Sequence, residues 1–130
     1  MKKVLLFIWQ LPQNILGLLV ILFTASKKSS CFWESKKLLN FGVSLGNYII
    51  FGYGPSKTSI QHEQGHQKQS LYLGWLYLLI IGLPSITFNI ADILFHKNWK
   101  RQDRIKWYYN LPWEHWADKL GNVNRFNAGV

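Results

Sequence analysis

Two short runs in this chain combine metal-binding and acid–base residues: residues 62–66 (HEQGH) and residues 114–118 (EHWAD). Residues four apart lie on one face of a helix, so His62 and His66 can present two imidazoles to one metal ion. Glu114 would supply a third protein ligand and leave a fourth position open for water, which is the ligand pattern of catalytic zinc. Together the two runs predict a zinc-hydrolase site with His62, His66 and Glu114 as ligands.

Two further acids of these runs have predicted roles beside the metal. Glu63 follows the first ligand directly and would act as the general base that takes a proton from the attacking water. Asp118 lies one helical turn after Glu114 on the same face, so it would orient a ligand histidine through a hydrogen bond. Zinc held in this way would polarise a substrate carbonyl, and the expected reaction is hydrolysis of a peptide bond.

A peptide hydrolase also needs a hydrogen-bond donor for the oxyanion that develops on the substrate carbonyl. Four residues near the second run carry suitable donors, and the sequence does not rank them: Tyr108, Tyr109, His115 and Arg104. The alternative for each is an ordinary role at a lipid surface. Asp92 and His96 form another acid–histidine pair four residues apart, for which pairing with a neighbouring group is the favoured interpretation.

The helix that carries the first run should begin near Thr58, because residues 58–61 (TSIQ) have the spacing of a capping box. It is predicted to run from about residue 59 to residue 83, polar in its first half and apolar in its second. Residues 82–85 (GLPS) should stop it, because glycine and proline disfavour a continuing helix.

This predicted stop matters for the site, because His66 and Glu114 must reach one metal ion. A straight membrane span over residues 71–95 would leave the two ligands on opposite sides of a hydrocarbon core about 30 Å thick. A hairpin that turns at residues 82–85 avoids this separation, since residues 86–108 then return along the first arm. The expected arrangement is therefore an active-site helix and a return helix that form a membrane-inserted hairpin.

The chain begins with an apolar stretch, which predicts a helix over residues 4–23 with a kink at Pro12. A basic connector is expected over residues 24–37. Lys2 and Lys3 before the apolar run are also compatible with a signal peptide, which is the alternative interpretation of this segment.

A short β element is predicted over residues 42–54, which begin with β-branched and aromatic residues and end in glycines. It precedes the active-site helix directly, so its edge could bind an extended peptide substrate by backbone hydrogen bonds. An ordinary structural hairpin is the alternative. Gly65, inside the predicted helix, could permit close approach of another backbone segment.

The last predicted element is a helix over residues 112–120 that carries the second run. Pro112 suits the first turn of a helix, and Gly121 would end it as a left-handed cap. In such a helix Glu114 and Asp118 lie on one face.

The 130 residues fit one domain, and their net charge of +9 is unevenly distributed. Residues 4–23 and 71–95 are almost free of charge, whereas lysines and arginines cluster at residues 2–3, 27–37 and 97–106. Both apolar stretches reach the length of a membrane span, and the basic clusters lie where anionic headgroups would meet them. The pattern predicts a mainly α membrane protein with a lipid bilayer as partner, and it disfavours nucleic-acid binding.

The side of the membrane follows less directly from the charges. Both long basic clusters agree with connectors on the cytoplasmic side, although Lys2 and Lys3 make the first crossing ambiguous. The expected localisation is therefore an integral-membrane protein of a cell membrane with its site on the cytoplasmic side.

The two motifs resemble those of the gluzincin metallopeptidases, in which H-E-x-x-H is followed by E-x-x-x-D on a later helix. The form E-x-x-A-D is similar to that of the integral-membrane branches: CAAX prenyl proteases, heat-shock membrane proteases and membrane sensor peptidases. The resemblance implies Zn²⁺ on His62, His66 and Glu114, catalysis by Glu63 and support by Asp118. It covers the two motifs and the order of elements, and the chain is much shorter than those enzymes.

The leading prediction is a small membrane-anchored zinc metallopeptidase that cleaves a peptide or a membrane-protein segment near the bilayer surface. The alternative is a non-catalytic, zinc-stabilised membrane protein that acts as an accessory, immunity or partner-binding factor. Glu63 separates the two hypotheses, because a structural zinc site needs no general base.

Overall fold

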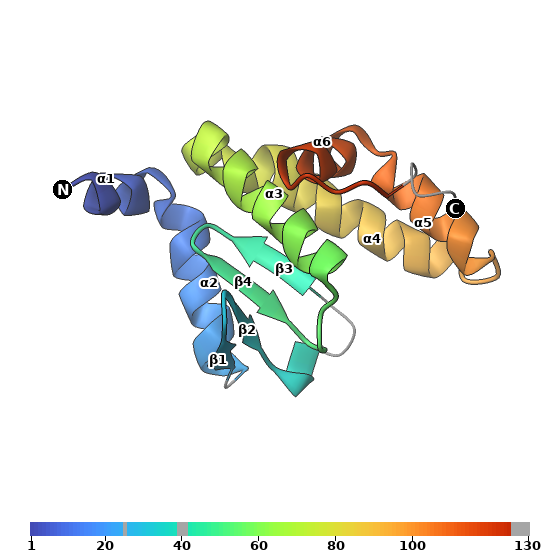
Figure 1. The fold of residues 1–130 in the computed structure, drawn as a ribbon, viewed down its shortest axis with the longest axis horizontal. Helices are drawn as coiled ribbons and strands as arrows, with labels where there is room; N and C mark the ends of the chain where they lie inside the picture. The colour runs from blue at the N-terminus through green and yellow to red at the C-terminus, as the bar shows by residue number, and fades with distance from the viewer. Residues whose placement is uncertain (25, 39–41, 126–130) are drawn as a thin grey trace.

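The computed structural model describes residues 1–24, 26–38 and 42–125, which form several helices and one small sheet (Figure 1). The mainly helical fold class predicted from the sequence is confirmed. The elements are α1 (Lys2–Trp9), α2 (Leu11–Phe23), β1 (Lys27–Ser29), β2 (Phe32–Glu34), η1 (Lys36–Leu38), β3 (Gly42–Leu45), β4 (Tyr48–Phe51), α3 (Lys57–Leu73), η2 (Gly74–Leu76), η3 (Leu78–Gly82), α4 (Leu83–Phe95), α5 (Arg101–Tyr109) and α6 (Pro112–Leu120).

The sheet has the strand order β1-β2-β4-β3, with β2 parallel to β4 and the other pairs antiparallel. The β3–β4 hairpin confirms the β element predicted after residue 42. The β1–β2 hairpin lies within residues 24–37, for which the sequence predicted a basic connector and no strand. Each of these two strands has three residues, and β1 is exposed throughout, so neither shows the alternation of apolar and polar residues that identifies a strand.

The turn of the β3–β4 hairpin is fixed by contacts with α2. Gly46 has a φ of 64°, a conformation that glycine adopts without strain. The Asn47 backbone N–H donates to Asn14 Oδ1 at 2.8 Å. On the sheet itself, Phe32, Ile49 and Phe51 form the buried apolar cluster. In the strand order β3 lies at one edge of the sheet.

The N-terminal apolar segment consists of two helices, α1 and α2, bent by 84° at Gln10. The sequence predicted a kink at Pro12, but the chain breaks two residues earlier, at Gln10. Pro12 lies in the first turn of α2, where a proline interrupts no helical hydrogen bond. The bend turns Gln13 toward the end of α3, where its Nε2 donates to Ser70 Oγ and Gly74 O, each at 2.8 Å. These buried hydrogen bonds make the N-terminal segment part of the folded domain.

The helical hairpin exists, but it turns earlier than predicted. Helix α3 ends at Leu73, and Gly74 turns the chain with a φ of 55° at a point where a side chain would overlap the ring of Trp9. At the predicted turn, Gly82 and Pro84 are instead helical. The π-helix η3 precedes the proline, and such a bulge accommodates the N–H that proline lacks.

After this turn, residues Leu78–Phe95 form one apolar helix of 18 residues, long enough to cross a membrane. Helices of this kind also occur in the cores of soluble proteins, where they are mostly buried. A separate helix, α5, follows it after an irregular segment, so the predicted return arm over residues 86–108 is divided in two.

Two details of the helix ends differ from prediction. The N-cap of α3 is Ser56, whose Oγ accepts a hydrogen bond from the Ser59 N–H at 3.2 Å, rather than Thr58. Helix α6 ends before Gly121 as expected, but Gly121 has a φ of −87° and the left-handed residue is Asn122, with a φ of 58°. Gly121 is needed for space instead, since a side chain there would overlap the carbonyl group of Gln61.

Candidate metal centre

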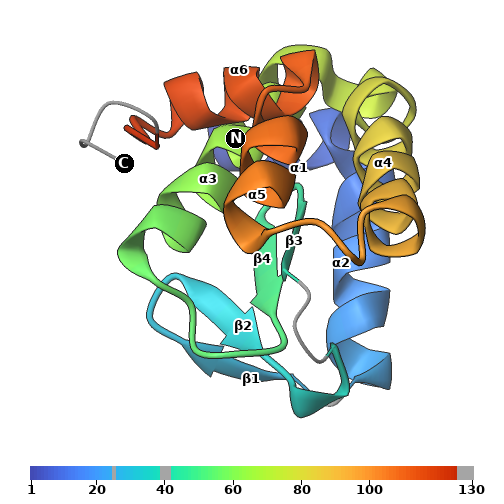
Figure 2. The same ribbon diagram turned by 90° about the vertical axis from the view of Figure 1, so that its right-hand side faces the viewer.

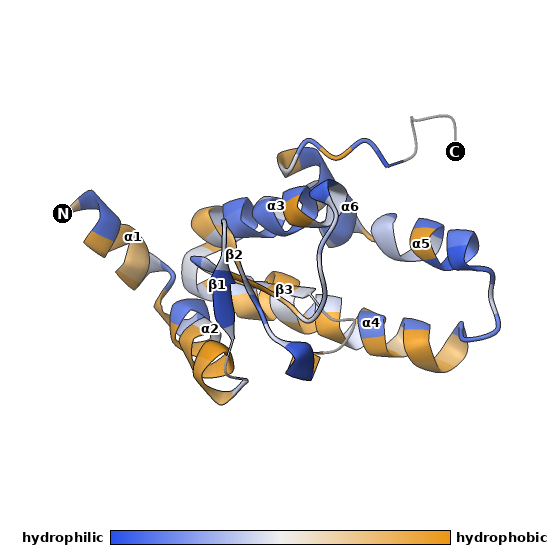
Figure 3. Ribbon diagram, turned by 60° about the horizontal axis from the view of Figure 1, so that its bottom comes forward, coloured by the Kyte–Doolittle hydropathy of each residue, from blue (hydrophilic) through white to orange (hydrophobic). Residues whose placement is uncertain are grey.

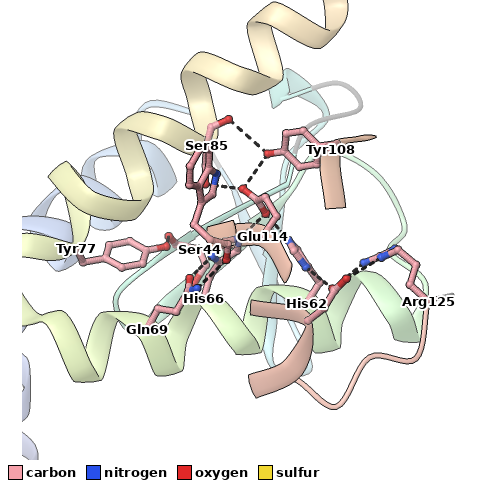
Figure 4. Close-up of polar contacts among 11 residues, drawn as sticks. Ser44, His62, His66, Gln69, Tyr77, Ser85, Tyr108, Glu114 and Arg125 are labelled. Atoms are coloured by element: carbon pink, nitrogen blue, oxygen red, sulfur yellow. Dashed lines mark hydrogen bonds and ion pairs between the residues drawn. The ribbon is translucent and has the colours of Figure 1, made fainter. Parts of the chain in front are cut away.

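Helices α3 and α6 bring together the three predicted ligands, His62, His66 and Glu114, all of them buried (Figure 4). One ligand atom from each residue lies within 4.8 Å of the others, so the group can hold a metal ion. The Nε2 atoms of His62 and His66 lie 3.0 Å and 3.1 Å from the same atom, Glu114 Oε2. The spacing argument from the sequence placed these side chains on facing helix surfaces correctly.

The close approach of the two helices depends on Gly65, which lies between the ligand histidines. A side chain at this position would overlap the backbone carbonyl of Ala117 on α6. Ala117 is itself fully buried. The sequence-based interpretation that Gly65 permits a close backbone contact is confirmed, and the contact holds Glu114 over α3.

Each ligand histidine is oriented through its other ring nitrogen. His62 Nδ1 lies 2.7 Å from Asp118 Oδ1, the partner expected from the sequence. His66 Nδ1 lies 2.7 Å from Gln69 Oε1, and Gln69 Nε2 donates to Trp113 O at 2.8 Å. Sequence reasoning missed Gln69, although its position three residues after His66 on the same helix face was a usable signal.

The second oxygen of Glu114 is held by two hydroxyl groups. Ser85 Oγ donates to Glu114 Oε1 at 2.5 Å, and Tyr108 OH donates to it at 3.1 Å (Figure 4). Glu114 Oε2 therefore remains directed at the histidines. Ser85 could not be identified from the sequence, because it is a single small residue inside an apolar helix.

Asp118 has a further partner from the segment after α6. Arg125 donates to both of its carboxylate oxygens at 3.0 Å, and the guanidinium carbon lies 3.5 Å above the ring centre of Tyr109. The Tyr109 ring in turn contacts the His62 ring edge to face, with centroids 5.0 Å apart. Nothing in the spacing of the motifs indicated Arg125.

Charge in the site is balanced between the imidazoles and the acids. Burial alone would lower the pKa of His62, but the hydrogen bonds to Asp118 and Glu114 and the charge of Glu63 raise it to about 9. Burial alone would raise the pKa of Glu114 and of Asp118. The histidine hydrogen bonds lower both pKa values instead, with Arg125 helping at Asp118. Both acids are therefore anionic at neutral pH.

Glu63 differs from the other acids of the site. Its side chain is buried, and its Oε2 has no hydrogen-bond partner among the residues that the structure describes. Burial raises its pKa, while the nearby His66 and His62 oppose this shift. A buried carboxyl group with an unsatisfied oxygen is costly unless another group meets it, so this oxygen is available to a ligand in the cavity.

The cavity beside Glu63 has a volume of about 590 Å³. One wall is the edge strand β3, and Tyr77 OH donates to the Ser44 carbonyl of that strand at 3.0 Å. The opposite walls are largely aliphatic and come from α2, η3 and α4, with Leu16 and Ile86 among them. The cavity can therefore accept an extended backbone and an apolar group side by side.

Of the four predicted oxyanion donors, two lie at the site and two do not. Tyr108 and Tyr109 line the cavity. Arg104 pairs with Asp92, with its Nη2 2.7 Å from Oδ2, and His115 is exposed on α6, so neither is a donor to this site.

Asp92 Oδ1 also lies 3.1 Å from His96 Nδ1, so this acid in an apolar helix pairs with two neighbouring side chains. This agrees with the interpretation favoured from the sequence.

Two imidazoles and one carboxylate, each ligand atom converging on one point and each histidine oriented from behind, fit the donor set of a zinc site. Comparison with protein-family models, with curated proteins and with solved structures finds no match to this chain.

Proposed function

We propose that this protein is a zinc metallopeptidase of the gluzincin type that acts at a membrane. The observation that carries the proposal is Glu63, a buried acid with an unsatisfied oxygen in a cavity that also contains the three ligand side chains. A site that only stabilised the fold would satisfy its buried acids and would need no cavity.

His62, His66 and Glu114 would hold the ion. When bound, zinc supplies a Lewis acid that activates water at neutral pH and polarises a carbonyl group. Ser85 and Tyr108 keep Glu114 Oε1 occupied, which favours binding through Oε2 alone and leaves room for a further ligand.

Glu63 would move the protons of the reaction. As a carboxylate it accepts a proton from the attacking water at Oε2, and it then delivers this proton to the nitrogen of the leaving amine. Its raised pKa suits this task, because a base that must also return its proton works best when its pKa is close to the working pH.

The edge strand β3 would align the substrate. Its residues Gly42–Leu45 line the cavity, and only one side of the strand pairs within the described sheet. A peptide that adds to the other side forms backbone hydrogen bonds and passes the metal centre. Since Tyr108 is occupied by Glu114, we assign the oxyanion donor to Tyr109.

The test measures zinc content and peptide cleavage in the same preparations. Zinc is determined by elemental analysis of the purified full chain, and cleavage by mass spectrometry of a proteome-derived peptide library. The variants are Glu63→Gln and Glu114→Ala, with Glu34→Gln on the exposed end of β2 as the matched control.

We expect about one zinc ion per chain in the parent, in Glu63→Gln and in Glu34→Gln, and much less in Glu114→Ala. Cleavage should occur only in the parent and in Glu34→Gln. Zinc in the parent without any cleavage that depends on Glu63 would support the non-catalytic alternative. Absence of zinc after reconstitution would overturn both.

A further inference from the structure

Large apolar side chains are exposed along three helices of this protein. They belong to α1, α2 and the helix from Leu78 to Phe95, and include Leu5, Leu19, Leu22, Leu79, Ile90 and Phe95. Coloured by hydropathy, α2 is largely orange and α4 has several orange turns, and both lie on the side of the molecule opposite α6 (Figure 3). The view along the long axis places α2 and α4 on the same side as well (Figure 2).

The exposure of this surface is too large for a core helix. Only 6% of the apolar helix Leu78–Phe95 is buried, whereas the core helix of a soluble protein is mostly buried. Exposed apolar side chains in such number mark a surface that binds a protein or a membrane.

The charges around the surface identify that partner. Each apolar helix has a pair of lysines beside one of its ends: Lys2 and Lys3 begin α1, Lys27 and Lys28 follow α2, and Lys97 and Lys100 follow α4. Apolar helices bordered by cations complement an anionic lipid surface. A second copy of the chain would instead bring cationic borders together, at a net charge of +9 for each copy.

The arrangement of α4 and α5 opposes a membrane crossing. Tyr108 OH of α5 lies 3.4 Å from the Ser85 carbonyl, and Ser85 is about 15 Å along the helix from Phe95. If this helix crossed a membrane with Phe95 at one headgroup layer, Ser85 and the neighbouring Tyr108 would therefore lie near the bilayer centre. Lys106 is exposed two residues before Tyr108, and such a charge is rarely found in hydrocarbon.

We propose that the protein is monotopic: α1, α2 and α4 lie in the plane of one leaflet, and the lysines at their ends bind anionic headgroups. The helices α3, α5 and α6 remain on the aqueous side. The proposal goes beyond the zinc chemistry and is independent of it.

The first test measures binding of the purified full chain to vesicles by flotation. Vesicles of phosphatidylcholine with phosphatidylglycerol are compared with vesicles of phosphatidylcholine alone. The acid variant Leu22→Glu/Ile90→Glu places two charges on the apolar surface, and Thr58→Glu on the exposed start of α3 is its control. The lysine variant Lys97→Gln/Lys100→Gln is matched by Lys57→Gln/Lys119→Gln on α3 and α6.

We expect the parent to bind anionic vesicles at least about tenfold more tightly than neutral ones. The acid variant should lose binding, the lysine variant should bind roughly tenfold more weakly, and both controls should bind as the parent does. Circular dichroism shows whether each variant is folded. Equal binding to both kinds of vesicle, or a stable dimer that covers the apolar surface without lipid, would overturn the proposal.

The second test distinguishes in-plane binding from a crossing. In a Cys31→Ser background, Tyr72→Cys at the exposed end of α3 and Asn98→Cys after α4 place single thiols at opposite ends of the apolar helix. Protein bound to preformed sealed vesicles is treated with a membrane-impermeant maleimide. In-plane binding predicts full labelling of both thiols, and protection of either one until the vesicles are lysed contradicts it.

Discussion

The two ligand histidines differ in the group that orients them. His62 has the carboxylate of Asp118 behind it, and His66 has the amide oxygen of Gln69. A carboxylate makes the imidazole a stronger ligand than a neutral amide does, because its charge favours positive charge on the ring. His62 is therefore the histidine whose partner matters most for metal affinity.

Asp118→Asn should weaken zinc binding by about 10-fold to 100-fold, the range typical for loss of such a partner. It removes the charge behind His62 and the ion pair with Arg125. Competition with a chromogenic chelator measures the affinity. The control Asp103→Asn changes an exposed acid of α5 and should leave the affinity unchanged. An Asp118→Asn protein with the parent's affinity would show that the hydrogen bond has no role in metal binding.

Protons should compete with the metal at His62. In the metal-free protein its pKa is about 9, so at neutral pH the ring carries a proton that must leave before it can bind zinc. Zinc affinity should therefore rise with pH, by up to about tenfold per unit, and should level off above pH 9. Calorimetric titrations in buffers of different ionisation enthalpy measure the released protons. A pH-independent affinity between pH 7 and 9 would contradict the expectation.

For individual site residues, the sequence predicted position correctly wherever spacing along a helix determines the geometry. His62 and His66 lie four apart on a helix, and Glu114 and Asp118 likewise, so each pair had to share a face. Ser85, Tyr77 and Arg125 reach the same site from other elements. No local pattern could reveal them, because their positions depend on how helices pack.

Among the contacts between elements, the one between α3 and α6 leaves the least room for an added side chain. Gly65→Ala would place a methyl group against the Ala117 carbonyl, where backbone and not a flexible side chain must move. We expect a loss of about 2 to 3 kcal/mol in the free energy of unfolding, together with reduced zinc content. Thermal and chemical unfolding measure the first and elemental analysis the second. Gly54→Ala is the control, since a Cβ there meets nothing within 4 Å.

The order of the larger elements followed from hydropathy, but the turns did not. Gly82 and Pro84 look like a break, yet Gly82 ends a π-helix that continues directly into α4, where Pro84 lies in the first turn. The actual turn at Gly74 lies against Trp9 of α1. The β1–β2 hairpin was missed because its strands are short and one is fully exposed. Such features are decided by tertiary contacts, which override local preference.

For the whole molecule, bound zinc should act as a link between α3 and α6. A ligand that binds only the folded state stabilises it by about 4 kcal/mol when present at a thousand times its Kd. Removal of zinc with a chelator should therefore lower the Tm by more than about 10 °C, and added zinc should restore it. Glu114→Ala should show little response to either treatment. A parent whose Tm ignores the chelator would exclude a strong zinc site.

Ser85 connects the exposed apolar helix with the metal centre, since it belongs to this helix and also donates to Glu114. A tilt or rotation of α4 moves this hydroxyl relative to α6 and changes how firmly the ligand oxygen is held. This hydrogen bond is a direct link between α4 and the ligand Glu114. If α4 lies in a leaflet as proposed above, we expect lateral pressure on this helix to change zinc affinity through Ser85. The difference in affinity between detergent and bilayer should shrink in Ser85→Ala.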